Sequence, residues 1–179
     1  LITISFPVYN VASTIERSLM SALNQTYSNI EYLIVDDCGS DNSMDILKNI
    51  LHNTSRKDQV KIIRHSSNKG LGAVRNTSIE NASGKYIYFM DSDDYLEPEF
   101  LEYLYNAAIE NDADIVCCNF NLYYPEKKLK IYMPFTSFPG VYSKTKALRK
   151  LILDMGIHYF VWNKLSKREL FFDNNLTFD

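Results

Sequence analysis

Acidic side chains directly follow two apolar runs of the sequence. The pair Asp36-Asp37 comes after Ile30–Val35, and Asp91–Asp94 comes after Tyr86–Met90. Both runs are short and rich in branched or aromatic residues, which is typical of buried β-strands. Carboxylates that converge on one crevice repel one another, and a divalent cation relieves that repulsion. The pattern therefore predicts a cation site formed by these acidic residues.

The triplet Asp91–Asp93 is a weak motif that its position strengthens. Asp-x-Asp triplets occur by chance, and Asp112–Asp114 is a second example in this chain. The second triplet precedes an apolar run, so we interpret it as a solvated turn. Asp91 and Asp93 follow a predicted strand, where a carboxylate can meet a ligand. We therefore predict Asp93 and Asp91 as the metal ligands.

One basic side chain, Arg75, is expected near these carboxylates. It lies in the glycine-containing segment Asn68–Asn76. This segment is not a Walker A motif, and it lacks the third glycine of a dinucleotide-binding fingerprint. Two interpretations of Arg75 remain open: a surface salt bridge, or a guanidinium group that faces phosphates in the acidic crevice.

The elements that must position these residues alternate between strands and helices. The expected strands are Ile2–Val8, Ile30–Val35, Val60–Arg64, Tyr86–Met90 and Ile115–Phe120. The expected helices cover residues 15–24, 43–51, 71–80, 98–111 and 144–153. Such alternation is typical of an α/β fold with a mostly parallel central sheet flanked by helices. Ligands of these sheets bind at the carboxyl ends of the strands, where Tyr9-Asn10 and the acidic residues lie.

The alternation ends after residue 121. A hairpin is predicted from residues 122–124 and 129–133, and Trp162–Lys164 opens a final mixed segment. We therefore expect an α/β core over residues 1–121 and an irregular subregion of the same domain over residues 122–179. Because the chain begins at Leu1, without a methionine, we expect a piece of a longer protein with a truncated C-terminus.

Composition excludes several classes of protein. The chain has 179 residues, of which 46% are hydrophobic, and a net charge of −3. A basic nucleic-acid-binding surface is therefore not supported, and no nucleic acid partner is expected. No apolar run approaches the ~20 residues that span a bilayer. The three cysteines form no CxxC pattern, which favours a reducing compartment. The three histidines have no metal-ligand spacing, and we assign them no chemistry.

Six motifs, taken together and in this order, resemble family 2 glycosyltransferases of the GT-A fold. They are Pro7–Asn10, Asn24–Tyr27, Val35–Asp37, Arg75-Asn76, Asp91–Asp94 and Trp162–Lys164. The resemblance covers nearly the whole chain and implies a Rossmann-like GT-A core. It also implies a metal-dependent, inverting hexosyltransferase that uses a nucleotide sugar, with UDP as the expected nucleotide. The implied acceptor is a hydroxyl group of a saccharide or of a lipid-linked sugar, in cell-surface polysaccharide synthesis.

The resemblance also implies roles for individual residues. The implied nucleotide-sugar-binding residues are Pro7, Tyr9, Asn10, Asp36, Asp37, Arg75, Asp91 and Ser92. Asp93 would bind Mn²⁺ or Mg²⁺ together with Asp91, and this metal would act as a Lewis acid on the leaving diphosphate. Trp162 and Asn163 would lie on the acceptor side.

The catalytic base is the residue that the resemblance leaves unassigned. In the family it usually lies in a Glu-Asp pair a little beyond a stretch like Phe171–Asp179, so we expect it beyond Asp179. Asp173 and Asp179 are weaker candidates. We expect a cytoplasmic protein, with peripheral association at the inner face of the membrane through the missing C-terminal part as a further expectation.

Two alternatives of other classes remain. A sugar nucleotidyltransferase would need a glycine-rich loop with Arg and Lys after the first strand, where this chain has Pro7–Ala12. A degenerate nucleotide-binding module would keep the crevice but not turnover, and the sequence does not exclude it.

Overall fold

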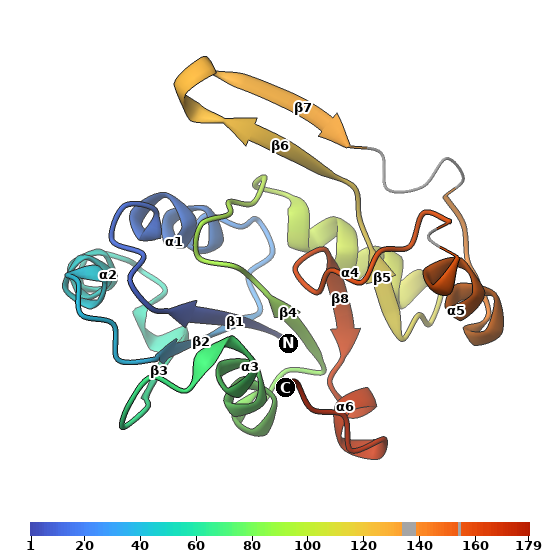
Figure 1. Cartoon of the computed structure of the whole chain (residues 1–179), viewed down its shortest axis with the longest axis horizontal. Helices are drawn as coiled ribbons and strands as arrows, with labels where there is room; N and C mark the ends of the chain where they lie inside the picture. Colours follow the sequence, from blue (N-terminus) through green and yellow to red (C-terminus); the bar gives the residue numbers. More distant parts are fainter. Residues whose placement is uncertain (134–138, 154) are drawn as a thin grey trace.

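A six-stranded sheet forms the centre of the molecule, as the computed structural model shows for residues 1–133, 139–153 and 155–179. The order of its strands is β3-β2-β1-β4-β8-β5 (Figure 1). The strands are β1 (Ile2–Val8), β2 (Ile30–Asp36), β3 (Val60–Arg64), β4 (Tyr86–Phe89), β5 (Ile115–Cys117) and β8 (Lys164–Lys167). The first four are parallel, and β8 is antiparallel to both of its neighbours. The predicted mostly parallel α/β sheet is confirmed.

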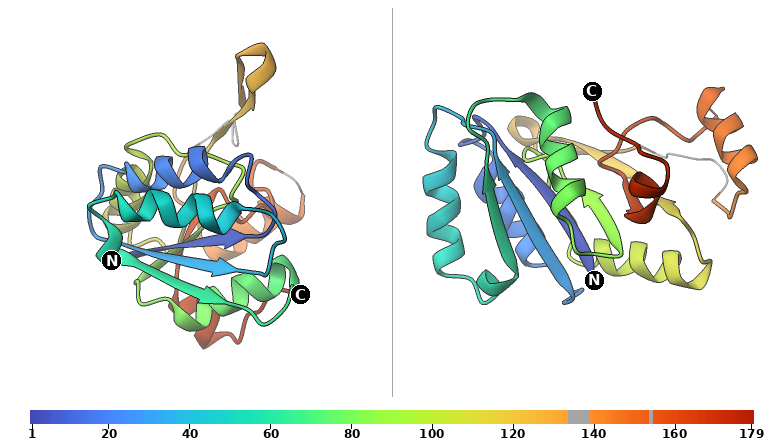
Figure 2. Two further views of the ribbon diagram at one scale, coloured as in Figure 1. Left: turned by 90° about the vertical axis from the view of Figure 1, so that its left-hand side faces the viewer. Right: turned by 90° about the horizontal axis from the view of Figure 1, so that it is seen from below.

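Helices cover both faces of this sheet (Figure 2). The helices of the described residues are α1 (Ile15–Leu23), α2 (Ser43–His52), α3 (Gly70–Asn81), α4 (Phe100–Glu110), α5 (Lys144–Ile152) and α6 (Glu169–Asp173), of which α5 lies beside the sheet (Figure 1) and has no buried residue. Apolar residues of α1, α2 and α4 form one core layer with β1, β2 and β4. On the other face, Ile79 of α3 packs in a second layer with Leu33, Ile87 and Phe89. The central strands β1, β2 and β4 are therefore buried on both sides.

The burial of β1 and β2 on both faces explains their composition. Ile2, Ile4 and Phe6 contribute to the first core layer, so every second residue of β1 is apolar. The intervening Thr3 and Ser5 are also buried. The Ser5 hydroxyl lies 2.7 Å from the Ser78 hydroxyl of α3, which satisfies both groups. Continuous burial is typical of strands in the interior of a parallel sheet.

The end of the predicted core differs from the expectation. The predicted strand Ile115–Phe120 is interrupted, because β5 ends at Cys117 and β6 (Phe120–Tyr124) begins a separate hairpin with β7 (Leu129–Met133). Asn163 is hydrogen-bonded to Cys118 at this break. Its backbone carbonyl accepts from the Cys118 N–H at 3.1 Å, and its side-chain amide donates to the Cys118 carbonyl at 3.3 Å. The predicted hairpin is confirmed and projects from the body of the molecule (Figures 1 and 2).

Strand β8 was not expected from its sequence, Lys164–Lys167. Two of its four residues are lysines, which pattern analysis assigns to a surface. In the structure, the Lys167 ammonium group pairs with Asp114 at 2.8 Å and with Asp112 at 3.1 Å. The turn Asp112–Asp114 is exposed, as predicted, and it also neutralises this lysine.

None of the helices in the described part of the chain is long and apolar enough to cross a membrane.

Gly84 provides a test of the packing between the start of β4 and β1. A methyl group at Gly84 would lie 2.6 Å from the Thr3 backbone nitrogen and 2.7 Å from the Tyr86 carbonyl oxygen. We predict that Gly84→Ala lowers the free energy of unfolding by about 2 kcal/mol, because overpacking displaces backbone. Urea denaturation measures this change. Gly140→Ala is the matched control, since its nearest contact would be 3.7 Å away. Equal stability of the two variants would contradict the packing.

Candidate functional site

The carboxyl ends of β1, β2 and β4 lie side by side and bring the predicted residues together. Val8 is paired with Asp36 in the sheet, and the Asp37 N–H donates to the Val8 carbonyl at 3.0 Å. On the other side of β1, the hydroxyl of Ser92 donates to the Pro7 carbonyl. The two acidic segments therefore flank the end of β1, as the topology of the sheet predicts.

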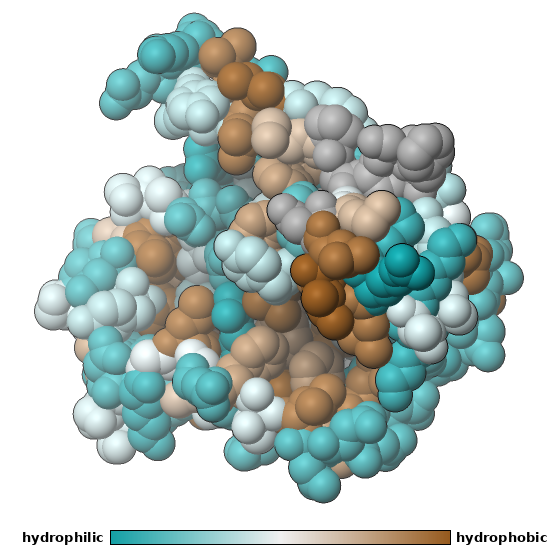
Figure 3. All heavy atoms as spheres, turned by 45° about the vertical axis from the view of Figure 1, so that its right-hand side comes forward, coloured by the Kyte–Doolittle hydropathy of each residue, from teal (hydrophilic) through white to brown (hydrophobic). Residues whose placement is uncertain are grey.

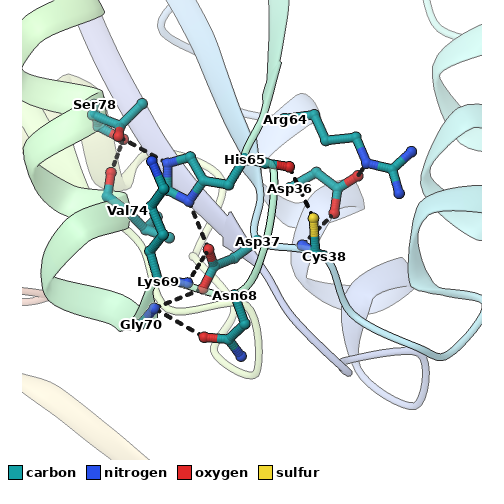
Figure 4. A network of polar contacts seen from close by, with 11 residues as sticks. Asp36, Asp37, Cys38, Arg64, His65, Asn68, Lys69, Gly70, Val74 and Ser78 are labelled. Carbon is teal, nitrogen blue, oxygen red and sulfur yellow. Dashed lines mark hydrogen bonds and ion pairs between the residues drawn. The ribbon is translucent and has the colours of Figure 1, made fainter.

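Asp37 is buried and its carboxylate organises the loop before α3 (Figure 4). One oxygen lies 2.6 Å from His65 Nδ1 and accepts from the Lys69 N–H at 2.9 Å. The other oxygen accepts from the Gly70 N–H at 2.9 Å. A carboxylate can only accept, so we place the proton of His65 on Nδ1. Asp37 thus joins the ends of β2 and β3 to the start of α3.

The environment of Asp37 favours the charged form. Burial alone would raise the pKa of this carboxyl, but the hydrogen bonds from His65, Lys69 and Gly70 outweigh burial and lower the pKa below 3.8. No sequence pattern indicated this role for His65, which directly follows β3. Contact between Asp37 and a nucleotide stays a prediction.

Asp36 lines a small pocket next to this network. Its carboxylate accepts from the Cys38 N–H at 3.0 Å and lies 3.4 Å from the Arg64 guanidinium. The pocket has a volume of about 170 Å³. Its lining residues come from β1, β2, β3 and α2 and from the loop after β2: Val8, Asn10, Asp36, Gly39, Asp41, Ser43, Met44, Asp45, Lys48 and Arg64.

Asn10 holds the loop that follows Asp37. Its side-chain oxygen accepts from the Ser40 N–H at 2.8 Å and from the Asp41 N–H at 3.3 Å. The approach is so close that a Cβ atom at Gly39 would lie 2.8 Å from the Asn10 nitrogen. Glycine is therefore required at position 39. Tyr9 next to it is exposed and leaves its ring available to a ligand.

Arg75 and Asp91 form an ion pair at the edge of the same site. The guanidinium lies 3.3 Å from the Asp91 carboxylate and 5.3 Å from the centre of the Phe178 ring. Arg75 therefore forms a salt bridge inside the acidic crevice. Contact of its guanidinium with phosphates stays a prediction. Burial and the charge of Asp93 raise the pKa of Asp91, despite the opposing effect of Arg75.

Negative charge accumulates on the loop after β4. Asp93 is exposed, and its backbone carbonyl accepts from the Arg17 guanidinium at 2.9 Å. Burial, together with the charges of Asp93 and Asp91, raises the pKa of Asp94 to about 6. Burial is the largest cause of the raised pKa values of Asp91 and Asp94, and the neighbouring carboxylates add to it.

The loop after β4 could supply some, but not all, of the ligands of a bound metal ion. In the described part of the chain, no three His, Cys, Asp or Glu side chains are arranged to hold a metal ion. Mg²⁺ in nucleotide sites is usually bound by one or two carboxylates, with phosphates and waters completing the shell. Asp93 and Asp91 could supply that share, and the excess charge around Asp94 favours a cation there.

The predicted acceptor-side residues lie at the base of the hairpin and differ in exposure. The Trp162 ring stacks on Phe160 with 5.0 Å between centroids and meets Phe120 edge-on at 4.8 Å. Asn163 is fully buried, and its hydrogen bonds to Cys118 join β8 to the end of β5. In this structure Asn163 positions the strands, and its contact with an acceptor stays a prediction.

The two candidate bases lie in the last segment of the chain. Asp173 is exposed in α6. Phe178 and Asn76 exchange two hydrogen bonds of 2.8 Å. This pairing brings Asp179 against α3, where a Cβ atom at Gly72 would lie 2.0 Å from the Asp179 carbonyl oxygen. Asp179 therefore lies against the helix that carries Arg75.

Comparisons with known proteins agree with this geometry. The model of the family described as "Glycosyl transferase family 2" matches residues 3–171. An uncharacterized glycosyltransferase, EpsJ of Bacillus subtilis, is 35% identical over all of this chain and 51% of its own length. The chain spans between a quarter and about half of the length of the curated relatives it matches.

Two solved structures share the fold. TarS of S. aureus, in complex with UDP, has a TM-score of 0.80 at 22% identity, over 99% of this chain and 50% of that one. A mannosyltransferase of Pyrobaculum calidifontis, in complex with GDP-Man and Mn²⁺, has a TM-score of 0.71 at 17% identity, over 99% of this chain and 47% of that one. At these identities the likeness establishes the fold alone, and it confirms the predicted GT-A type.

The Asp37 network predicts a specific dependence of stability on pH. The pKa of Asp37 is lower in the folded state than its ordinary value of 3.8. Its contribution to stability is therefore complete above the unfolded pKa and is lost as pH falls through the folded pKa. We predict that Asp37→Asn lowers the free energy of unfolding at neutral pH by about 1–3 kcal/mol.

Urea denaturation between neutral and acidic pH tests this prediction. Below about pH 4 the difference between the parent and Asp37→Asn should shrink, because the parent carboxyl becomes protonated. Asp173→Asn serves as the control, since Asp173 is exposed. A constant difference at all pH values would exclude the carboxylate as the source of the stability.

Proposed function

Because this chain belongs to glycosyl transferase family 2, we propose that it transfers a sugar from a UDP-sugar to a hydroxyl group of an acceptor. The observation that carries the proposal is the Arg75–Asp91 pair at the carboxyl edge of the sheet, with exposed Asp93 beside it. The Arg75 guanidinium could bind phosphates, the Asp91 carboxylate could accept from ribose hydroxyls, and the Asp93 carboxylate could bind a metal ion. All three lie close together at this edge.

The nucleoside part of the donor would occupy the region around Tyr9 and the Asp36 pocket. The exposed Tyr9 ring offers a face on which a base can stack. Asp36 and Asn10 both line the pocket next to Tyr9 in which the nucleoside would lie. Pro7 and Ser92 would act indirectly, since the hydrogen bond from the Ser92 hydroxyl to the Pro7 carbonyl fixes the Asp91–Asp94 turn against β1. UDP is supported by its presence in the TarS complex.

The diphosphate would lie between Arg75 and Asp93. Binding would redirect the Arg75 guanidinium from Asp91 toward phosphate oxygens, with which guanidinium groups form strong paired hydrogen bonds. Mn²⁺ or Mg²⁺ held by Asp93 and Asp91 would supply Lewis-acid stabilisation of the leaving diphosphate. The Mn²⁺ named with the Pyrobaculum enzyme supports metal use of this kind.

The acceptor would approach from the side of the hairpin, where Trp162 lies among other aromatic rings. We propose a saccharide or lipid-linked acceptor in polysaccharide synthesis at the cytoplasmic side of the membrane. Inversion at the anomeric carbon requires a base for the attacking hydroxyl group. We propose that this base lies beyond Asp179, with Asp179 ahead of Asp173 among the residues present because of its place beside α3.

Asp93 provides the test of metal-dependent donor binding. We predict that Asp93→Ala weakens binding of UDP in the presence of Mn²⁺ by about tenfold or more, since loss of even an indirect metal contact has effects of this size. Thermal unfolding with UDP, with and without Mn²⁺, measures the binding. Asp112→Ala is the control, because Asp112 belongs to the exposed turn beside Lys167. Unchanged UDP binding by Asp93→Ala would refute the metal assignment.

Arg75 distinguishes phosphate binding from a structural role. We predict that Arg75→Ala weakens UDP binding by about tenfold to a hundredfold, because it removes charge-assisted hydrogen bonds. Binding of uridine should change little, since a neutral nucleoside has no phosphate. Calorimetric titration of both ligands makes the comparison. Equal losses for UDP and uridine would mean that Arg75 acts only through the structure of the site.

A further inference from the structure

Helix α5 has an apolar face that the described part of the protein leaves uncovered. No residue of this helix is fully buried. Leu148 and Ile152 lie four positions apart, on one side of the helix, and are 46% and 79% exposed. Leu153, directly after the helix, is 53% exposed. Figure 3 shows apolar surface directly beside hydrophilic surface on the side of the molecule that carries α5.

Basic side chains flank this apolar face. The helix contains four basic residues and no acidic one, and two of the four, Lys146 and Lys150, lie over the Tyr142 ring on the other side of the helix. Lys144 and Arg149 line the same shallow groove as Leu148 and Ile152. The whole chain has a net charge of −3, so this concentration of positive charge is local. It departs from the average surface of the protein.

The charges on α5 favour one kind of partner. A symmetric contact between two copies of this face would bring two Lys144 and two Arg149 side chains together, and like charges oppose such an interface. An anionic lipid surface has complementary charge and accepts apolar side chains below its headgroups. The long aliphatic stems of lysine and arginine lie along apolar surface while their charged ends reach the headgroups.

We propose that α5 is a surface-binding helix that attaches this protein to membranes containing anionic lipids. Leu148, Ile152 and Leu153 enter the boundary between headgroups and acyl chains. Lys144 and Arg149 contact the headgroup phosphates. The proposal does not rest on the proposed transferase activity, because none of these residues belongs to the candidate donor site.

Flotation with lipid vesicles tests this proposal. The chain should bind vesicles of phosphatidylcholine mixed with phosphatidylglycerol, and bind vesicles of pure phosphatidylcholine weakly. Salt should reduce this binding, because it screens the charges. Arg149→Glu should reduce the partition into anionic vesicles by at least about fivefold, the effect of one basic residue at such a surface. Ile152→Ser should reduce it by about tenfold, through loss of buried apolar area.

Matched variants elsewhere on the molecule control for general effects of charge and hydrophobicity. Ile109→Ser removes an isoleucine of α4 that is 48% exposed, and Lys57→Glu reverses an exposed charge. Both should bind vesicles like the parent. Thermal unfolding checks that every variant is folded, and UDP binding, measured in parallel, should be the same for Ile152→Ser and the parent.

Three results would overturn the proposal. The first is that the folded chain fails to bind anionic vesicles, and the second is that the α5 variants bind as well as Ile109→Ser and Lys57→Glu. The third is self-association by sedimentation that Ile152→Ser abolishes while vesicle binding is unaffected, which would make the face an interface between copies. Loss of UDP binding in Asp93→Ala bears on the donor site alone, so the two proposals fail separately.

Discussion

The buried carboxylate of Asp37 is the interaction on which the arrangement of the site depends. It joins three segments that the chain brings together from different directions: the end of β2, His65 after β3, and the first residues of α3. Asp37 itself follows β2, and the other two segments present three N–H groups that need an acceptor: those of His65 Nδ1, Lys69 and Gly70. Satisfying all three with one acidic side chain fixes where α3 begins. The start of α3 in turn determines where Arg75, one and a half turns further on, meets the crevice.

A second constraint is electrostatic. Burial is the largest cause of the raised pKa values of Asp91 and Asp94 in the loop after β4, and the charges of Arg75 and Arg17 only partly oppose it. Natural proteins keep such an imbalance where a ligand supplies the missing charge. The packing on either side of the loop is otherwise well satisfied, since Ser92 is tied to β1 and Asp93 is held by Arg17 through its backbone. Hydrogen bonds therefore hold the loop in position, while its carboxylates lack a full set of positively charged partners.

The sequence was sufficient to predict the parallel part of the sheet and the edge that carries the site. Strands β1, β2 and β4 are rich in apolar residues because both of their faces are buried, and polar residues at the ends of neighbouring parallel strands meet at one edge. The contacts that fix the site could not be predicted in this way. His65 and Asp37 are 28 positions apart, and nothing in their local sequence indicates the pairing.

The same limit applies to the second half of the chain. Asn163 belongs to a recognisable motif, yet only the structure reveals that its side chain donates to the Cys118 carbonyl directly after β5. Strand β8 escapes pattern analysis because Lys167 is neutralised by residues more than fifty positions earlier. Periodicity describes the burial of an element. It does not reveal which distant residue pairs with a polar side chain and so allows that side chain to lie in a buried strand.

The place of β8 in the sheet has a consequence for the biosynthesis of the protein. Strand β5 joins the described sheet only through β8, and β8 also covers the outer edge of β4. The parallel strands β1 to β4 can pair as soon as Phe89 has left the ribosome, but the edge of β4 stays open until Lys164 has been made. At roughly 5–20 residues per second, that interval lasts several seconds. During it, the nascent chain exposes an unpaired strand edge of the kind that pairs with other chains, so newly made molecules need protection until this late strand arrives.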